Sequence, residues 1–311
     1  MVGPVDFKFI QDSDIQVVAE ALFHLDREGT RWARVFRQTY DMIYNGQETG
    51  RYRWNQLMKT EKTHFGTLFE INAQREFGFD ARDSDATDYR ISGIPVDAKW
   101  SQHRGRWMLP PEIIGDIALV ATADDTASRW SLGLVRVLPE LRSEGLNRDK
   151  KSTLNPAGKK AVLWLWDNAR MPPNILLQLE PEVVDYIFDH RHGTERTNRL
   201  FRAAEGRIVH RNSVATVSRQ LDPQKRVRYN GGARSALAPE GYVILSGKYY
   251  PRFASALGVP VPGPLEYVSV RVIPSTGSEG VLIADRLWRR ATDDDVIKEA
   301  APRLPERGRS E

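Results

Sequence analysis

Two aspartates lie nine residues apart in the segment TDYRISGIPVDAKW, residues 87–100. Ser92-Gly93 in its middle is a two-residue turn signal between short runs of strand-forming residues, so the segment is predicted to form a tight β-hairpin. With these two residues as the turn, Asp88 lies directly opposite Asp97. Directly opposed residues share one face of a hairpin, about 5 Å apart at Cβ. The pattern therefore predicts two carboxylates face to face.

Lys99 extends the charged face, because it follows Asp97 by two positions and side chains alternate along a strand. Val96 and Ala98 then point the other way, into a core. Opposed carboxylates destabilise a sheet unless a cation lies near them. That cation is either the Lys99 ammonium, in an ordinary surface hairpin with an ion pair, or a bound divalent metal ion.

A metal ion at this position would have a specific chemistry. Mg²⁺ takes oxygen ligands and is usually held by one or two carboxylates together with water and substrate phosphates. The ion would polarise a phosphoryl oxygen and generate hydroxide near neutral pH. Lys99 would orient the attacking water or offset the charge that develops on the phosphate.

Hydrophobic spacing predicts the elements that position the hairpin. Helices are expected around residues 15–22, 32–43 and 60–79, with 44–50 as a loop between them, and buried strands at residues 117–122, 131–138 and 161–166. Glu70 lies inside the third helix, where an acid is by default a surface residue. Helices flanking these strands predict an α/β domain with a mixed sheet over residues 1–166.

A second domain is predicted after a proline-containing linker at residues 167–174. Residues 175–311 read as mainly helical, with a helix at 213–221, a basic helical segment at 224–237 and a strand at 240–247. Helix, turn, basic helix and β-wing is the order of a winged helix-turn-helix, in which the later helix enters the major groove of DNA. The glycine pair inside the basic segment leaves the limits of that helix open.

Composition narrows the class of protein. The chain has 311 residues, 41% of them hydrophobic, which favours two globular domains. No apolar run approaches the length of a membrane span, and the N-terminus lacks a signal-peptide pattern. With no cysteine, disulfides and thiolate metal sites are excluded. We expect a protein of a reducing interior such as the cytoplasm, without a membrane partner.

Positive charge is concentrated in residues 191–234, which contain eleven lysines or arginines and three acids. Such a segment is typical of a protein that binds nucleic acid, although a solvated charged face gives the same pattern. A basic and aromatic loop directly after the hairpin has the same two interpretations. The candidate DNA-contacting residues are His103, Arg104 and Arg106 in that loop, and Arg219, Lys225, Arg226, Arg228 and Arg234 in the basic segment. Which of them contact bases rather than phosphates is left open.

Several stretches, taken together and in order, resemble the NaeI-type (type IIE) restriction endonucleases of the PD-(D/E)xK nuclease superfamily. They are TGRYRWNQLMKTEKTHFGTLFEIN, DYRISGIPVDAKWS, WMLPPE, LGLVRV, VLWLW, PPNILL and KRVRYNGGARSAL. The likeness runs from roughly residue 39 to residue 290 and so covers both expected domains. The Asp-x-Lys pair alone would identify nothing.

The resemblance implies an endonuclease N-terminal domain that requires Mg²⁺. Asp88, Asp97 and Lys99 stand at the positions of the superfamily's Asp…Asp-x-Lys, and Glu70 at that of its additional helical acid. All four would be catalytic, with the three carboxylates as metal ligands. The family acts as homodimers on palindromic duplex DNA, here a GC-rich site such as GCCGGC, as part of a restriction-modification system. The C-terminal domain would bind a second copy of the target as an effector.

Two other functions remain as alternatives. A structure-specific nuclease or repair nickase would use the same four residues. A non-catalytic DNA-binding regulator could keep a nuclease-like scaffold, but such a scaffold has no reason to retain opposed carboxylates. Sequence-specific cleavage of both strands distinguishes the restriction enzyme from both alternatives.

Overall fold

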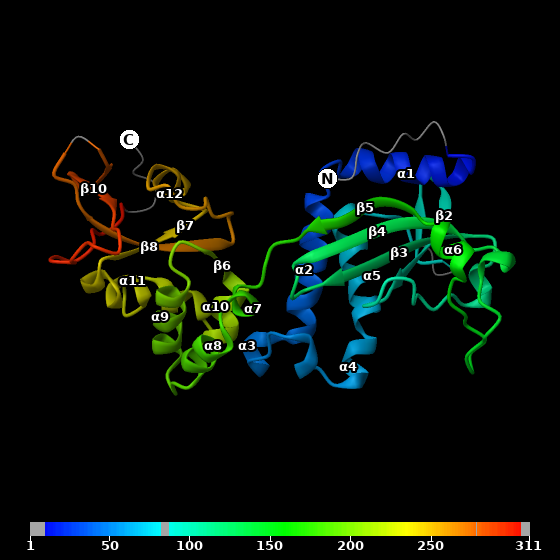
Figure 1. The fold of residues 1–311 in the computed structure, drawn as a ribbon, viewed down its shortest axis with the longest axis horizontal. Coiled ribbons are helices and arrows are strands. Elements are labelled where there is room, and N and C mark those ends of the chain that lie inside the picture. The colour runs from blue at the N-terminus through cyan, green and yellow to red at the C-terminus, as the bar shows by residue number, and fades with distance from the viewer. Residues whose placement is uncertain (1–9, 82–86, 278, 306–311) are drawn as a thin grey trace. The chain divides into compact units, whose positions relative to one another are not determined.

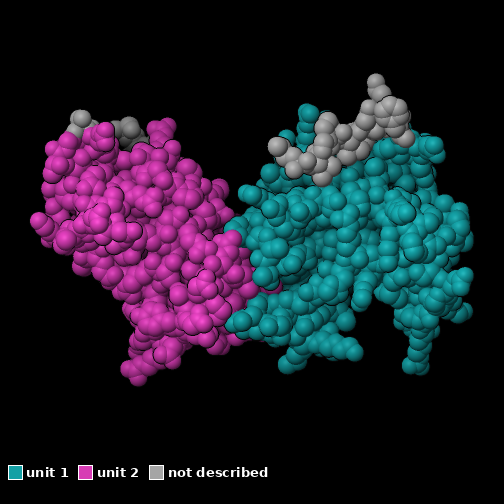
Figure 2. Space-filling view, in the orientation of Figure 1, with its two compact units in different colours: residues 1–43, 53–173 teal, residues 44–52, 174–311 magenta. Residues whose placement is uncertain are grey.

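The computed structural model describes residues 10–81, 87–277 and 279–305. The chain divides into two compact units (Figure 1, Figure 2). Unit 1 comprises residues 1–43 and 53–173, and unit 2 comprises residues 44–52 and 174–311. None of the described helices is both long and apolar enough to span a membrane.

Unit 1 is built on a five-stranded mixed sheet in the order β1-β2-β3-β4-β5. Its strands are β1 (Tyr89–Ile91), β2 (Ile94–Trp100), β3 (Ile117–Asp124), β4 (Arg129–Arg136) and β5 (Leu163–Arg170). The pair β2 and β3 is parallel, and every other neighbouring pair is antiparallel. The predicted mixed α/β architecture of the N-terminal part is confirmed.

Two of the helices cover one face of this sheet through aromatic contacts. The helices of unit 1 are α1 (Ser13–Leu25), α2 (Thr30–Tyr44), α4 (Lys59–Thr63), α5 (Phe65–Phe77) and α6 (Pro156–Lys160). Phe65 of α5 stacks on Trp100 of β2 with ring centroids 4.1 Å apart, and Phe36 of α2 lies 5.2 Å from Trp130 of β4. The contact between Phe65 and Trp100 fixes α5 over β2, the strand that carries Asp97 and Lys99.

The other face of the sheet carries a separate apolar cluster that includes Trp107, Leu109 and Ile113 from the segment after β2. Trp107 also donates its indole N–H to the carbonyl oxygen of Ala121 in β3, 2.8 Å away. The chain that leaves the hairpin is therefore anchored to the sheet within a few residues of Lys99.

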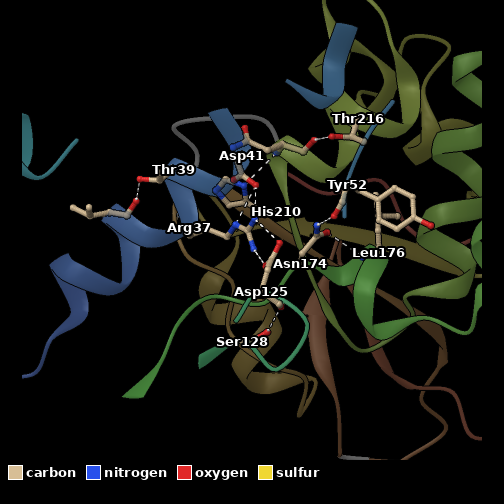
Figure 3. A network of polar contacts seen from close by, with 12 residues as sticks. Arg37, Thr39, Asp41, Tyr52, Asp125, Ser128, Asn174, Leu176, His210 and Thr216 are labelled. Carbon is tan, nitrogen blue, oxygen red and sulfur yellow. Dashed lines mark hydrogen bonds and ion pairs between the residues drawn. The ribbon is translucent and has the colours of Figure 1, made fainter. Parts of the chain in front are cut away.

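A buried ion pair ties α2 to the turn after β3 (Figure 3). Arg37 contacts both carboxylate oxygens of Asp125, and its Nη2 lies 2.9 Å from Asp41 Oδ1. Arg37 and Asp125 are each 4% exposed, and removing one member of a buried ion pair is strongly destabilising. This pair is a packing feature of unit 1.

Unit 2 combines short helices with a second five-stranded sheet, in which β8 pairs with β6, β7 and β10, and β9 pairs with β10, all antiparallel. The strands are β6 (Ile208–His210), β7 (Tyr242–Ser246), β8 (Glu266–Pro274), β9 (Val281–Ile283) and β10 (Arg286–Arg290). The helices are α3 (Gly46–Thr49), α7 (Ile175–Gln178), α8 (Pro181–Phe188), α9 (Gly193–Ala203), α10 (Arg211–Ser218), α11 (Ala233–Ala236) and α12 (Pro251–Ala256). One apolar cluster lies on the helical side of β7, around Ile244, and another on the opposite side, around Leu245.

The basic segment of unit 2 differs from its prediction. Instead of one helix over residues 224–237, it forms a 3-10 helix at Pro223–Val227 and the single-turn α11. The glycine pair separates them: Gly231 has φ +70°, and a Cβ on Gly232 would lie 2.5 Å from the carbonyl oxygen of Arg228. The strand expected as a wing, β7, is buried along its whole length and paired with β8.

Two boundaries also differ from those expected. Residues 44–50, expected as a loop of the first domain, contain α3 and belong to unit 2. Residues 167–170, expected as the start of a linker, continue β5, where Arg170 pairs with Arg129 of β4. In both cases packing partners distant in the sequence decide the structure.

Candidate active site

The hairpin has the predicted register. Ser92 and Gly93 form the turn with φ of +52° and +81°, the positive values that a type I′ turn needs at both central positions. The Cα partners are Tyr89 with Val96, Arg90 with Pro95 and Ile91 with Ile94. One step further along this register, beyond the ladder itself, Asp88 comes opposite Asp97.

The two aspartates and Lys99 form one polar group. Lys99 makes an ion pair with Asp97, and its Nζ lies 4.0 Å from Asp88 Oδ2. Asp88 Oδ2 also accepts a hydrogen bond of 2.8 Å from the main-chain N–H of Ala98. The side chain of Asp97 is 5% exposed, against 29% for Asp88. The Asp97 carboxylate thus lies at the bottom of the group, with Asp88 nearer to solvent.

Glu70 reaches this group from α5. The helix packs with Phe65, Phe69 and Ala73 inward and ends at Gly78 in the left-handed conformation, φ +69°. Tyr89, beside Asp88 in the hairpin, donates its hydroxyl hydrogen to the carbonyl oxygen of Glu70, 2.8 Å away.

The role of Tyr89 was not predicted, although the sequence contains a signal for it. The hairpin register puts Tyr89 on the inward face opposite Val96, and it is 2% exposed. A buried tyrosine needs a hydrogen-bond partner for its hydroxyl. The identity of that acceptor depends on how α5 packs, which the register does not give.

Electrostatics couples the three carboxylates. The pKa of Glu70 is raised to about 7, mainly by burial and also by repulsion from Asp88 and Asp97, with Lys99 opposing the rise. The pKa of Asp97 is raised to about 6, mainly by burial and in part by repulsion from Asp88, and Lys99 offsets some of the rise. Acids with raised pKa values beside a lysine are typical of functional sites.

The carboxylates of the site meet only part of what a divalent cation needs. Over the described residues, no three histidine or acidic side chains lie close enough together to form a ready-made metal site. The three carboxylates are therefore not preassembled as a metal site, and Lys99 is the present ion-pair partner of Asp97. Asp88 and Asp97 nevertheless fit Mg²⁺, which usually takes only one or two protein carboxylates beside substrate phosphates.

The loop after β2 contains residues of two kinds. Arg104 is engaged within the protein: its Nη1 and Nη2 lie 2.7 and 3.1 Å from the two oxygens of Asp167, and its guanidinium stacks 3.8 Å from the ring of Trp164. His103 and Arg106 are exposed. Arg104 therefore fixes the loop to β5, whereas His103 and Arg106 have no such structural contact with other described residues through their side chains.

The five residues of unit 2 that were predicted to contact DNA also differ in their surroundings. Arg234 donates from Nε to the carbonyl oxygen of Ile244, 2.9 Å away, and so supports the fold. Lys225 and Arg228 are exposed. Arg219 donates to the carbonyl oxygen of Glu48, and Arg226 donates to the hydroxyl of Thr194. The five residues do not share one helix face, because the helix expected to carry most of them is interrupted.

Comparison with known proteins identifies the family. A family model described as Restriction endonuclease NaeI matches residues 16–299. A type II restriction enzyme NaeI from Lentzea aerocolonigenes is 45% identical over 300 residues, covering 93% of this chain and 94% of that protein. The chain belongs to the NaeI restriction endonuclease family.

As a NaeI-family restriction endonuclease, the protein is a type II site-specific deoxyribonuclease, a phosphodiester hydrolase of a restriction-modification system. Its substrate is DNA. The family model matches residues of both units, so both units belong to the family's fold. The resemblance read from the sequence is confirmed, and a purely regulatory function is not supported.

Proposed function

We propose that this NaeI-family enzyme cleaves both strands of a palindromic duplex in a reaction that requires Mg²⁺ and takes place at the hairpin of unit 1. One observation carries the proposal. Asp88 and Asp97 are held together across a tight turn, with Lys99 between them and Glu70 beside them on α5.

Each residue has a role in this proposal. Asp88 and Asp97 hold the cation, and Glu70 is the third acid of the set. When bound, Mg²⁺ polarises the phosphoryl oxygen and lowers the pKa of water. With a cation held by Asp97, Lys99 would no longer be the counter-ion of that carboxylate. Its ammonium then orients the attacking water and offsets negative charge on the phosphate in the transition state.

DNA binding in the proposal involves both units. In unit 1, His103 and Arg106 contact the backbone near the cut, and Arg104 contributes charge while fixing the loop. In unit 2, Arg219, Lys225, Arg226, Arg228 and Arg234 line or support a helix-turn-helix-like surface for a second copy of the target, which stimulates cleavage. A homodimer matches the two-fold symmetry of a palindrome such as GCCGGC. The net excess of eight positive charges over residues 191–234 supports the part played by unit 2.

The primary test is digestion of DNA of known sequence, with and without Mg²⁺, followed by reading of the fragment ends. We expect double-strand cuts at one GC-rich palindrome and none in EDTA. Nicks confined to one strand, or cuts at branched structures, would favour the repair-type nuclease instead.

A second test addresses the effector site. A short duplex that contains the target is added to a substrate with a single target site, and the initial rate of cleavage is measured. We expect faster cleavage with the target duplex than with a scrambled duplex of equal length. Equal rates with both would contradict the two-site proposal while leaving the nuclease assignment intact.

A further inference from the structure

Three guanidinium groups gather at the start of α9 in unit 2. They belong to Arg196 in the first turns of that helix, Arg219 at the C-terminal cap of α10, and Arg226 in the 3-10 helix that follows. Arg196 Nη2 donates to the carbonyl oxygen of Ser218, 3.3 Å away, and Arg226 Nη1 donates to Thr194 Oγ1, 3.1 Å away. These contacts join three segments at one point.

Gly193 makes this approach possible. A Cβ on Gly193 would lie 2.1 Å from the carbonyl oxygen of Ser218 and 2.9 Å from Gln220 Nε2, so no larger residue fits without a shift. The first turn of α9 therefore touches the end of α10. That turn also presents main-chain N–H groups that have no acceptor within the helix, at its positive end.

The charge at this point is not neutralised by acids. Within the described residues, no carboxylate lies within 4.0 Å of Arg196, Arg219 or Arg226. Arg202, on the same helix as Arg196, differs: it pairs with Glu240 at 2.7 Å and with Glu195 at 3.1 Å. The one acid in the first turn of α9 is therefore already paired.

Local electrostatics agrees with this geometry. Burial lowers the pKa of Arg196, and the nearby charge of Arg219 lowers it further. Arg219 itself donates to the carbonyl oxygen of Glu48, 2.9 Å away, and not to an acid. Clustered guanidinium groups without counter-ions are unfavourable alone and become favourable when an anion joins them.

We propose that Arg196, Arg219 and Arg226, with the Thr194 hydroxyl, form a cradle for one backbone phosphate of duplex DNA. Arginine binds phosphate through its planar set of N–H donors, and such contacts fix the register of a protein on DNA without reading its sequence. The inference rests on the proposed function for its ligand. It adds Arg196 and Thr194 to the DNA-contacting residues and gives the cradle a positioning function, separate from base recognition.

The test measures how DNA binding depends on salt. The full chain is titrated in EDTA, where cleavage is prevented, with a fluorescent duplex at several NaCl concentrations. Each phosphate contact adds about 0.9 to the slope of log K against log salt concentration. We expect Arg196→Ala to flatten that slope by about 0.9, and Arg196→Lys to keep it. Arg202→Ala is the matched control on the same helix and should leave it unchanged.

The outcomes separate the two proposals. An unchanged slope for Arg196→Ala, or an equal flattening for Arg202→Ala, would overturn the cradle. If Arg196→Ala melts at a lower temperature than the parent, the exposed Arg219→Gln replaces it and must flatten the slope by the same amount. A parent protein that does not bind duplex DNA at all would instead contradict the proposed function of unit 2.

Discussion

The hydroxyl of Tyr89 and the main-chain carbonyl of Glu70 are joined by a hydrogen bond of 2.8 Å between the hairpin and helix α5. The bond connects the two elements that supply the proposed catalytic carboxylates. It therefore fixes the position of Glu70 relative to Asp88, because Asp88 is the residue next to Tyr89. A main-chain contact of this kind positions the acid without using its side chain.

Tyr89→Phe tests this connection. Loss of a single buried hydrogen bond should lower the free energy of unfolding by about 1 kcal/mol, measured by urea denaturation. The rate of plasmid cleavage should fall several-fold, because a shift of about 1 Å in a catalytic group costs up to about 10²-fold. Tyr40→Phe is the matched control: Tyr40 donates to the carbonyl of Ala123, 3.0 Å away, outside the site. Equal loss of cleavage in both variants would mean that the Tyr89 hydroxyl contributes to stability and not to positioning Glu70.

Asp97→Asn should abolish cleavage while DNA binding persists. The substitution keeps the shape of the side chain but removes the charge that Lys99 and the cation share. We expect cleavage of supercoiled plasmid to fall by about 10²-fold or more, and affinity for the duplex in EDTA to change little. The exposed Asp149→Asn serves as the control, with full activity expected. Cleavage at the parental rate by Asp97→Asn would place the active site elsewhere.

Glu70→Gln should stabilise the metal-free protein at alkaline pH. The pKa of Glu70 in the folded protein is about 7, above its ordinary value of 4.5. Between these two values the unfolded chain loses the proton first, so stability falls as pH rises from about 4.5 to about 7. Glutamine removes that loss.

The measurement is thermal melting in EDTA at pH 5 and pH 8. The gain in melting temperature of Glu70→Gln over the parent should be larger at pH 8. Glu182→Gln, an exposed glutamate of α8, should give no gain at either pH. A gain independent of pH would mean that burial does not perturb Glu70.

The two arginines of the loop after β2 should differ in their effect on DNA binding. The Arg106 side chain is exposed and has no hydrogen bond or ion pair within the described residues, whereas Arg104 is engaged with Asp167. Burial alone would raise the pKa of Asp167, but hydrogen bonds from Arg104 and Ser131 outweigh it and lower the pKa. Arg106→Ala should flatten the salt dependence of binding by about 0.9 in slope, and Arg104→Ala by less. The reverse order would show that the pair with Asp167 opens when DNA binds.

Gly46→Ala should destabilise unit 2. A Cβ at this position would lie 2.1 Å from Thr216 Oγ1 of α10, and overpacking of this kind costs about 1–3 kcal/mol. Gly145→Ala, where a Cβ meets nothing within 4 Å, should be neutral. Thr216→Ala combined with Gly46→Ala should restore part of the loss, measured by urea denaturation. Independent effects of the two substitutions would contradict this packing of α3 against α10.

Local patterns in the sequence were sufficient for the hairpin. Its register follows from the turn residues Ser92-Gly93 and from side-chain alternation, both of which are properties of neighbouring residues. The inward face of α1 was predicted for the same reason: Ile15, Val18, Ala19 and Leu22, spaced for one helix face, are all buried.

Features that depend on distant partners were not predicted. Tyr89 and Glu70 are separated by a stretch whose path the sequence does not specify, so their bond required the structure. The ion pair of Arg104 with Asp167 joins segments 63 residues apart. Helix α3 is only four residues long and has little intrinsic propensity to form. Its stability comes from α10, far along the chain.

The assignment of residues 44–52 to unit 2 bears on how this protein is made. During translation these nine residues leave the ribosome with unit 1, long before the partner against which they pack exists. Unit 2 can complete its fold only after α10 has been synthesised and α3 has packed against it. Residues 174–311 produced alone would lack one of their own helices, and adding a peptide of residues 44–52 in trans should restore what is missing.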